Sequence, residues 1–237
     1  MHPSPLAGFL LHAARPALSP CALFAAAVVL GAPPIAQAEE IWRLNELAKA
    51  PSARVTRFGA PRATEVRGHA AVVFDGAEDG LLVNENPLAG AATFTIELLF
   101  SPAEDGGAAQ RFLHVQDRQD RRALIELRLN SRGWWLDGFL RAAADPADPG
   151  LALIDPTRIH ETDRWYWVAL RYDGHSLATF VNGAKEGEGP AKFAPFGPGK
   201  VSLGVRQNLV YWFKGAIAEA RFHREALSDE KLQRIVE

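Results

Sequence analysis

The chain has 237 residues, with 26 Lys and Arg against 28 Asp and Glu, so a net charge of −2 excludes the basic surface of a typical nucleic-acid-binding protein. Its single cysteine, Cys21, excludes a fold held together by internal disulfides. The length suits one domain with an ordinary hydrophobic core.

The first 38 residues have the features of a signal peptide. They contain one arginine, Arg15, no lysine and no carboxylate, and residues 22–30 form an apolar run that is too short to span a bilayer. Ala36-Gln37-Ala38 then offers small residues where a signal peptidase cleaves. We therefore expect cleavage after Ala38, which would remove Cys21 and leave a secreted or periplasmic chain without a transmembrane segment.

The rest of the chain is predicted to consist of a lead-in segment, residues 39–68, and one domain, residues 69–237. In the lead-in segment, residues 40–49 are expected to form a short helix with Ile41, Leu44 and Leu47 near one face. Pro51 would end this helix, because proline cannot continue it.

From His69 onward the pattern changes to short strands. Apolar and polar residues alternate with a period of two, which is typical of half-buried strands. The clearest segments are residues 94–100, 123–130, 165–172 and 201–206. The dipeptides Asp173-Gly174 and Asn182-Gly183 are tight-turn sequences between strands. This pattern predicts an all-β fold, a two-sheet antiparallel β-sandwich of the jelly-roll type.

One short helix is expected at the C-terminal end. Ser228 would cap it, Asp229 and Glu230 would lie in its first turn, and Leu232 and Ile235 would face inward.

Four ordered groups of residues resemble the laminin G-like domains of the concanavalin A-like lectin and glucanase superfamily. They are Phe74-Asp75-Gly76, Phe94-Thr95-Ile96-Glu97, the segment from Asp163 to Gly183, and Phe213-Lys214-Gly215-Ala216-Ile217 with the residues up to Ser228. The resemblance implies the jelly-roll fold. It implies no single function, because such domains include lectins, carbohydrate-binding modules, adhesion domains and glycan-cleaving enzymes.

The resemblance also raises a structural calcium ion as a possible cofactor, and no other cofactor is expected. Asp75 and Asp79, with Asn84, could supply the oxygen ligands that calcium prefers. However, relatives often carry an Asp in the closing strand where this chain has Ala218. The Asp-Gly pairs at Asp75 and Asp79 are also ordinary turn sequences.

Two kinds of polysaccharide-active enzyme provide an alternative. Glucanases of this superfamily carry paired carboxylates on one strand, but residues 124–130 contain only Glu126, followed by Arg128. Some jelly-roll lyases instead carry a pattern similar to Ile125-Glu126-Leu127-Arg128, then Arg158-Ile159-His160, then Tyr211. An enzyme of this kind would use Glu126, Arg128, His160 and Tyr211.

A non-catalytic binding module is the function that we favour over an enzyme. Sugars bind through flat aromatic side chains and through Arg, Asn and Asp, and such residues occur on the polar parity of the strands. The predicted contact residues are Arg128, Trp135, Arg206, Asn208 and Trp212. The partner would be a carbohydrate or a protein surface, so an adhesion domain that binds no sugar remains a third possibility.

Overall fold

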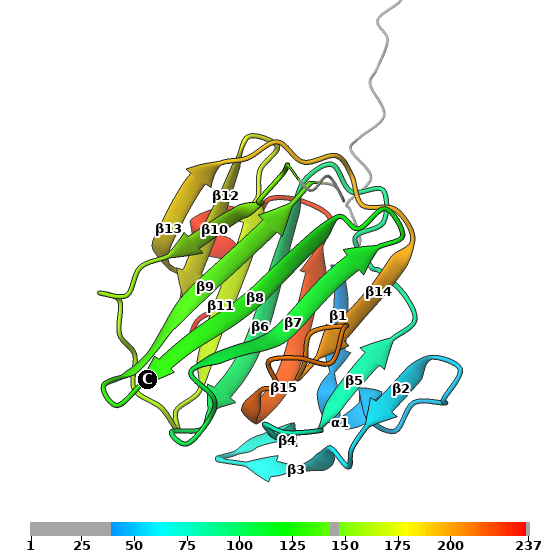
Figure 1. Ribbon diagram of the computed structural model, residues 1–237, viewed down its shortest axis with the longest axis vertical. Coiled ribbons are helices and arrows are strands. Elements are labelled where there is room, and N and C mark those ends of the chain that lie inside the picture. The colour runs from blue at the N-terminus through cyan, green and yellow to red at the C-terminus, as the bar shows by residue number, and fades with distance from the viewer. Residues whose placement is uncertain (1–38, 143–146, 236–237) are drawn as a thin grey trace, which may run out of the picture. The chain divides into compact units, whose positions relative to one another are not determined.

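The computed structural model describes residues 39–142 and 147–235. The predicted signal peptide, residues 1–38, lies outside the described residues. Residues 39–142 and 147–235 form two antiparallel sheets of eight and seven strands packed against each other, with almost no helix (Figure 1). The prediction of an all-β, two-sheet sandwich is confirmed.

The eight-stranded sheet forms one layer. Its strands, in spatial order, are β13 (Ala184–Pro190), β12 (Ser176–Val181), β11 (Tyr166–Tyr172), β6 (Phe94–Pro102), β15 (Lys214–His223), β4 (His69–Asp75) and β3 (Arg62–Val66), and β1 (Glu39–Arg43) also pairs with β15.

The seven-stranded sheet forms the other layer. Its strands, in spatial order, are β10 (Leu151–Ile154), β9 (Gly133–Arg141), β8 (Arg122–Asn130), β7 (Ala109–Asp117), β14 (Gly199–Leu203), β5 (Gly80–Val83) and β2 (Val55–Phe58). In Figure 1 this sheet faces the viewer, with β7, β8 and β9 in green.

The core lies between the two sheets and follows the predicted alternation. Phe94, Ile96, Leu98 and Phe100 of β6 point into it. Phe100 stacks on Phe112 of the facing sheet at a centroid distance of 4.5 Å. Stacked and tilted aromatic pairs of this kind add to the stabilisation that comes from burying their area.

The turn dipeptide Asn182-Gly183 connects β12 and β13 as predicted. Asn182 has a φ of 47° and Gly183 a φ of 75°. Two successive positive φ angles match the twist of a tight hairpin, which is why Asn-Gly is favoured there.

Residues 39–68 add strands to both sheets, since β1 pairs with β15, β2 with β5 and β3 with β4. The helix expected over residues 40–49 is only α1 (Leu44–Leu47), and the residues before it extend as β1. Leu44 and Leu47 are buried as predicted, but Ile41 is exposed and Trp42 takes the buried position. Strand pairing with β15 overrides the helical spacing of these residues.

The C-terminal helix is shorter than predicted, because only the 3-10 turn η1 (Asp229–Lys231) forms. Ser228 precedes it, but its side chain makes no capping hydrogen bond to the turn. Leu232 is buried as expected. No helix in the described part of the chain is long and apolar enough to cross a membrane.

Candidate functional site

The candidate site lies on the outer face of the seven-stranded sheet. The hairpin of β8 and β9 places Glu126 opposite Asp137 and Arg128 opposite Trp135. Side chains directly opposite each other in an antiparallel pair share a face of the sheet. Because the intervening Leu127 lies in the core, these four side chains point away from it.

Most of these side chains line a cleft of about 310 Å³, which we call the arginine cleft. Its walls come from β7, β8, β9 and β10 and from the loop after β14. The lining residues are Arg111, Leu124, Glu126, Arg128, Asp137, Phe139, Ala152, Ile154 and Arg206. The cleft therefore combines three arginines and two carboxylates with apolar walls.

The charges in the arginine cleft are partly paired. Arg128 donates to Asp137 Oδ2 from Nε at 2.9 Å and from Nη2 at 2.7 Å. Arg111 Nε lies 3.0 Å from Glu126 Oε2, in an ion pair rather than a hydrogen bond. The ion pairs among the described residues of the cleft do not include Arg206, which is attracted to Glu126 only at longer range. Three arginines against two carboxylates leave the cleft with an excess of positive charge.

Glu126 is buried at the floor of the cleft, with 5% of its surface exposed. Burial and the neighbouring Asp137 raise its pKa to about 7, although Arg111 and Arg128 act in the opposite direction. Removing a carboxylate from water favours its protonated form. Near neutral pH, Glu126 therefore changes between a hydrogen-bond donor and an anionic acceptor.

The loop between β14 and β15 forms one rim of the cleft. Arg111 N donates to Tyr211 O at 2.9 Å, which attaches the loop to β7. The Tyr211 ring lies over the Arg111 guanidinium, whose carbon is 3.6 Å from the ring centroid. Leu209 and Tyr211 both have positive φ angles, near 60°, and both are exposed. A non-glycine residue rarely adopts this conformation outside tight turns.

His114 is buried beside the cleft, on the outer side of β7. Burial and the nearby Arg206, Arg122 and Arg111 lower its pKa to about 3, so its ring is neutral at neutral pH. Its Nδ1 accepts a hydrogen bond from Gln207 N at 3.2 Å, so the ring proton lies on Nε2.

Several buried donors on this face lack an acceptor in the described chain. They are Arg111 Nη1, His114 Nε2 and Arg122 Nε. Buried polar groups are nearly always hydrogen-bonded, either to protein or to ordered water. Burial and the nearby Arg122 and Arg111 also lower the pKa of Arg206. The face thus concentrates hydrogen-bond donors, of which the arginine donors are cationic, with few acceptors to satisfy them.

Two of the five predicted contact residues line the arginine cleft, namely Arg128 and Arg206. Trp135 is half-buried on the same face, directly opposite Arg128. Asn208 lies exposed in the rim loop. Trp212 packs over Gly80 of β5, where an added Cβ would lie 3.4 Å from its Cζ3.

The four residues of the lyase hypothesis do not gather at one point. Glu126 and Arg128 line the cleft, and Tyr211 stands at its rim. His160 instead pairs with Trp134 across a backbone bridge, and its ring lies tilted against that buried ring at a centroid distance of 4.7 Å. It is therefore on the core side of the sheet, away from Glu126, and its Nε2 contacts Glu186 at 2.8 Å. The register of β9 explains the separation, because Trp134 and Trp135 point to opposite faces.

The two proposed calcium ligands have structural roles. Asp75 Oδ1 accepts hydrogen bonds from the backbone N–H groups of Ala77, Glu78 and Asp79. The Asp79 carboxylate accepts from Ala60 N at 2.7 Å and from Asp75 N at 3.2 Å. These are loop-capping bonds. In residues 39–142 and 147–235, no cluster of three or more His, Cys, Asp or Glu side chains could hold a metal ion.

The sequence did not single out Arg111, Asp137, Phe139 and Ile154 as contacts, although all four line the cleft. Asp137 could have been identified from the register of the hairpin between β8 and β9, because this register places it directly opposite Glu126. The turn is Ser131-Arg132, which lacks the Asn-Gly or Asp-Gly signature of a tight hairpin.

The chain belongs to the concanavalin A-like lectin/glucanases superfamily, whose family profile matches residues 75–233. This confirms the resemblance seen in the sequence. No curated protein sequence matches the chain.

Solved structures with the same fold include three glycan-related proteins. The Ruminococcus gnavus IT-sialidase CBM40 bound to α2,3-sialyllactose has a TM-score of 0.52 at 21% identity, covering 68% of this chain and 94% of that chain. Domain 4 of AbnA, a GH43 extracellular arabinanase from Geobacillus stearothermophilus, in complex with arabinotriose, has a TM-score of 0.51 at 18% identity, covering 81% and 85%.

The third is the K499G mutant of the NanB sialidase from Streptococcus pneumoniae, with a TM-score of 0.53 at 16% identity. The alignment covers 68% of this chain but only 26% of the sialidase. At these identities the similarity shows the shared fold alone.

Proposed function

We propose that this chain is a carbohydrate-binding module whose arginine cleft takes the acidic sugar of a glycan. The observation that carries the proposal is the excess of cationic donors in a concave cleft on the open face of a β-sandwich. Arginine matches a carboxylate in geometry as well as in charge. The sialyllactose named for the CBM40 relative carries such a carboxylate, which supports the proposal.

The roles follow from the positions of the side chains. Arg206 would bind the carboxylate of the sugar, because it forms no ion pair with a carboxylate of the described residues. Glu126 and Asp137 would accept hydrogen bonds from sugar hydroxyls. Phe139 and Ile154 provide apolar surface for the C–H groups of the sugar ring.

A titration with matched ligands tests this function. The mature protein is titrated with α2,3-sialyllactose and with lactose, which differ by the acidic sugar. We expect sialyllactose to bind and lactose to bind at least tenfold more weakly, because charge-assisted hydrogen bonds contribute about 1.5–3 kcal/mol. Binding should weaken as salt is raised. The acidic sugar of the natural ligand can also be a uronate. In that case a glycan array will show binding to uronate-containing glycans and none to sialylated ones.

Arg206→Ala should reduce acidic-glycan affinity by roughly 10- to 100-fold. The matched control is Arg62→Ala, an exposed arginine on β3 of the other sheet, which should bind like the unmodified protein. Equal affinity for acidic and neutral glycans, or normal binding by Arg206→Ala, would contradict the proposal.

One observation favours a second candidate, a glycoside hydrolase. Glu126 and Asp137 are opposed across β8 and β9, and Arg128 Nη2 lies 3.9 Å from the first carboxylate and 2.7 Å from the second. Glycosidases use a pair of carboxyl groups on one surface, and retaining enzymes hold them about 5–5.5 Å apart. Asp137 Oδ2 already accepts two hydrogen bonds from Arg128, which opposes that role because the carboxylate is engaged. New reducing ends from a bound oligosaccharide, abolished in Glu126→Gln, would establish hydrolysis.

A further inference from the structure

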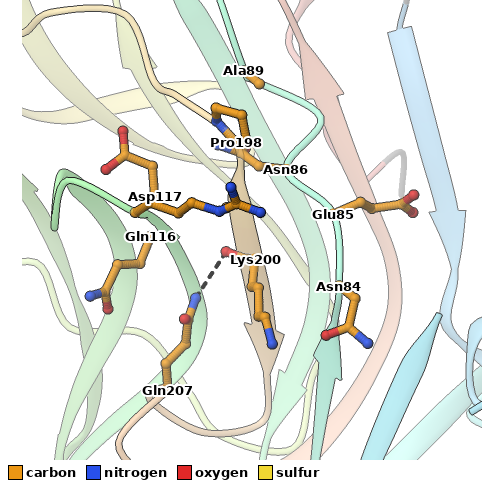
Figure 2. A pocket seen from close by; sticks show the side chains of 11 residues that line it. Asn84, Glu85, Asn86, Ala89, Gln116, Asp117, Pro198, Lys200 and Gln207 are labelled. Atoms are coloured by element: carbon orange, nitrogen blue, oxygen red, sulfur yellow. Dashed lines mark hydrogen bonds between the residues drawn. The ribbon is translucent and has the colours of Figure 1, made fainter. Parts of the chain in front are cut away.

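A second cleft opens on the same face of the seven-stranded sheet, and it is shown in Figure 2. It has a volume of about 490 Å³ and lies where β7 ends, β14 begins and the chain leaves β5. We call it the amide cleft, because Asn84, Asn86, Gln116 and Gln207 line it together with Lys200.

Strand register places the amide cleft on the outer face. Lys200 is directly opposite Gln116 in the pairing of β14 with β7. Val201 is opposite Val83 in the pairing of β14 with β5, and both lie in the core. Asn84 and Lys200, one residue further along their strands, therefore point outward with Gln116. Three adjacent strands thus present a row of polar side chains on the same side as the arginine cleft.

Gln207 connects the two clefts. Its backbone N donates to His114 Nδ1, beside the arginine cleft, and it follows Arg206 directly in the chain. Its side-chain Nε2 donates to Lys200 O at 2.9 Å and to His114 O at 3.1 Å, as drawn in part in Figure 2. The amide oxygen of Gln207 takes no part in these bonds and remains an acceptor at the edge of the amide cleft.

The carboxylates of the amide cleft are engaged by protein groups outside the set that could contact a ligand. Asp117 accepts from Gly197 N and Arg121, and Glu85 accepts from Arg54. No ion pair involves Lys200 in the described ranges. The groups left for a ligand are therefore amide oxygens, the Lys200 ammonium and the exposed Arg118 guanidinium. The two cations of the lining balance its two carboxylates, Glu85 and Asp117, so the cleft suits the hydroxyl groups of a neutral sugar.

The separation of the clefts sets the size of the ligand. Along β7, the rise from Arg111 to Gln116 is about 16 Å at the usual spacing of a strand. One sugar ring cannot reach both residues, but a chain of several sugars can. We infer that the amide cleft binds the neutral sugars that follow the acidic sugar, so that the module recognises an extended oligosaccharide.

This inference rests on the proposed function. Affinities measured for acidic glycans of increasing length can show which of the two, the proposed function or this inference, fails. The mature protein is titrated with the methyl glycoside of sialic acid, with sialyllactose and with a linear sialylated pentasaccharide. We expect affinity to rise at least tenfold from the monosaccharide to the pentasaccharide. The double variant Lys200→Ala, Gln116→Ala should lose this increase while keeping the affinity for the monosaccharide, which also shows that it is folded. Lys192→Ala, an exposed lysine after β13, is the matched control.

Each outcome is decisive. Monosaccharide binding without an increase with length overturns the amide cleft as a subsite and leaves the arginine cleft intact. An increase that persists in the double variant overturns it as well, because the added sugars then bind elsewhere. Absence of binding by all three acidic ligands overturns the proposed function for sialic acid, and with it the inference.

Discussion

The two outer faces of the sandwich differ in what covers them. On the eight-stranded sheet, the C-terminal residues lie over β6, β11 and β12, where Phe180 is fully buried against Leu227 and Leu232. Thr95 of β6 accepts from Leu227 N and donates to Glu225 O. Gln233 N also donates to Glu97 Oε1 at 2.7 Å, and Leu99 packs against Trp167 of the neighbouring strand. All nine residues of β6 are buried, on both faces.

The outer face of the seven-stranded sheet carries the arginine cleft and the amide cleft instead. Its buried polar groups include donors that the described chain does not satisfy. The comparison shows that the two outer faces of one sandwich can have different roles. The covered face uses its side chains for stability, and the open face keeps polar and charged groups at a cost that a bound ligand can offset.

The largest effect on stability is expected from Phe180→Ala on the covered face. Removing a fully buried ring leaves a cavity, and such changes cost about 3–5 kcal/mol. Urea unfolding followed by fluorescence would measure the loss. Ile154→Ala on the open face is the contrasting variant, because Ile154 is 46% exposed and should cost no more than about 0.5 kcal/mol. Similar losses for the two variants would contradict the division between the faces.

The next effect concerns two arginines of the same cleft. Arg128→Ala should destabilise the fold by roughly 3 kcal/mol, because it leaves the buried Asp137 carboxylate without its partner. Arg206→Ala removes no such partner and should change stability by about 0.5 kcal/mol or less. Urea unfolding of both variants distinguishes a structural arginine from one available to a ligand. Equal losses would mean that Arg206 also stabilises the fold.

Glu126 predicts a pH dependence of stability. Its pKa is raised from 4.5 to about 7 by burial and by Asp137. Below pH 4.5 the group is protonated in both states. Between pH 4.5 and 7 the unfolded chain loses the proton and the folded chain keeps it, so stability falls as pH rises, by at most about 3 kcal/mol.

Glu126→Gln should remove this contribution. The free energy of unfolding, measured in urea from pH 4 to 8, should then fall less steeply with pH than in the unmodified protein. Glu65→Gln, an exposed change of the same charge on β3, should leave the profile parallel to the original. Parallel profiles for Glu126→Gln would show that its carboxyl is not perturbed by burial.

The alternation of residues was sufficient to predict the fold. In β6, β8 and β11 the apolar residues of one parity are in the core, as the period of two required. The pattern could not predict β1, because residues 40–47 also have helical spacing, and only pairing with the distant β15 decides between the two. Local patterns carry no information about such long-range pairing.

The site was predictable only in part, for the same reason. Arg128 and Arg206 could be chosen by residue type and parity, and they do line one cleft. The opposition of Glu126 and Asp137 depends on the register of a hairpin without a strong turn signal. The position of His160 depends on a bridge to Trp134 outside the named strands. Residue type alone therefore could not separate the open face from the core side.

The two tryptophans predicted as sugar platforms give the smallest and most specific test. Trp135 lies opposite Arg128, beside the arginine cleft. Trp212 packs over Gly80 on β5, four strands from β9 in the sheet order, which corresponds to about 19 Å. Trp135→Ala should therefore weaken acidic-glycan binding by about 1 kcal/mol, or roughly fivefold, by removing apolar surface next to the sugar. Trp212→Ala should leave the affinity for an acidic monosaccharide unchanged. A calorimetric titration of both variants decides between them, since a loss in Trp212→Ala alone would move the acidic sugar to the other end of the face.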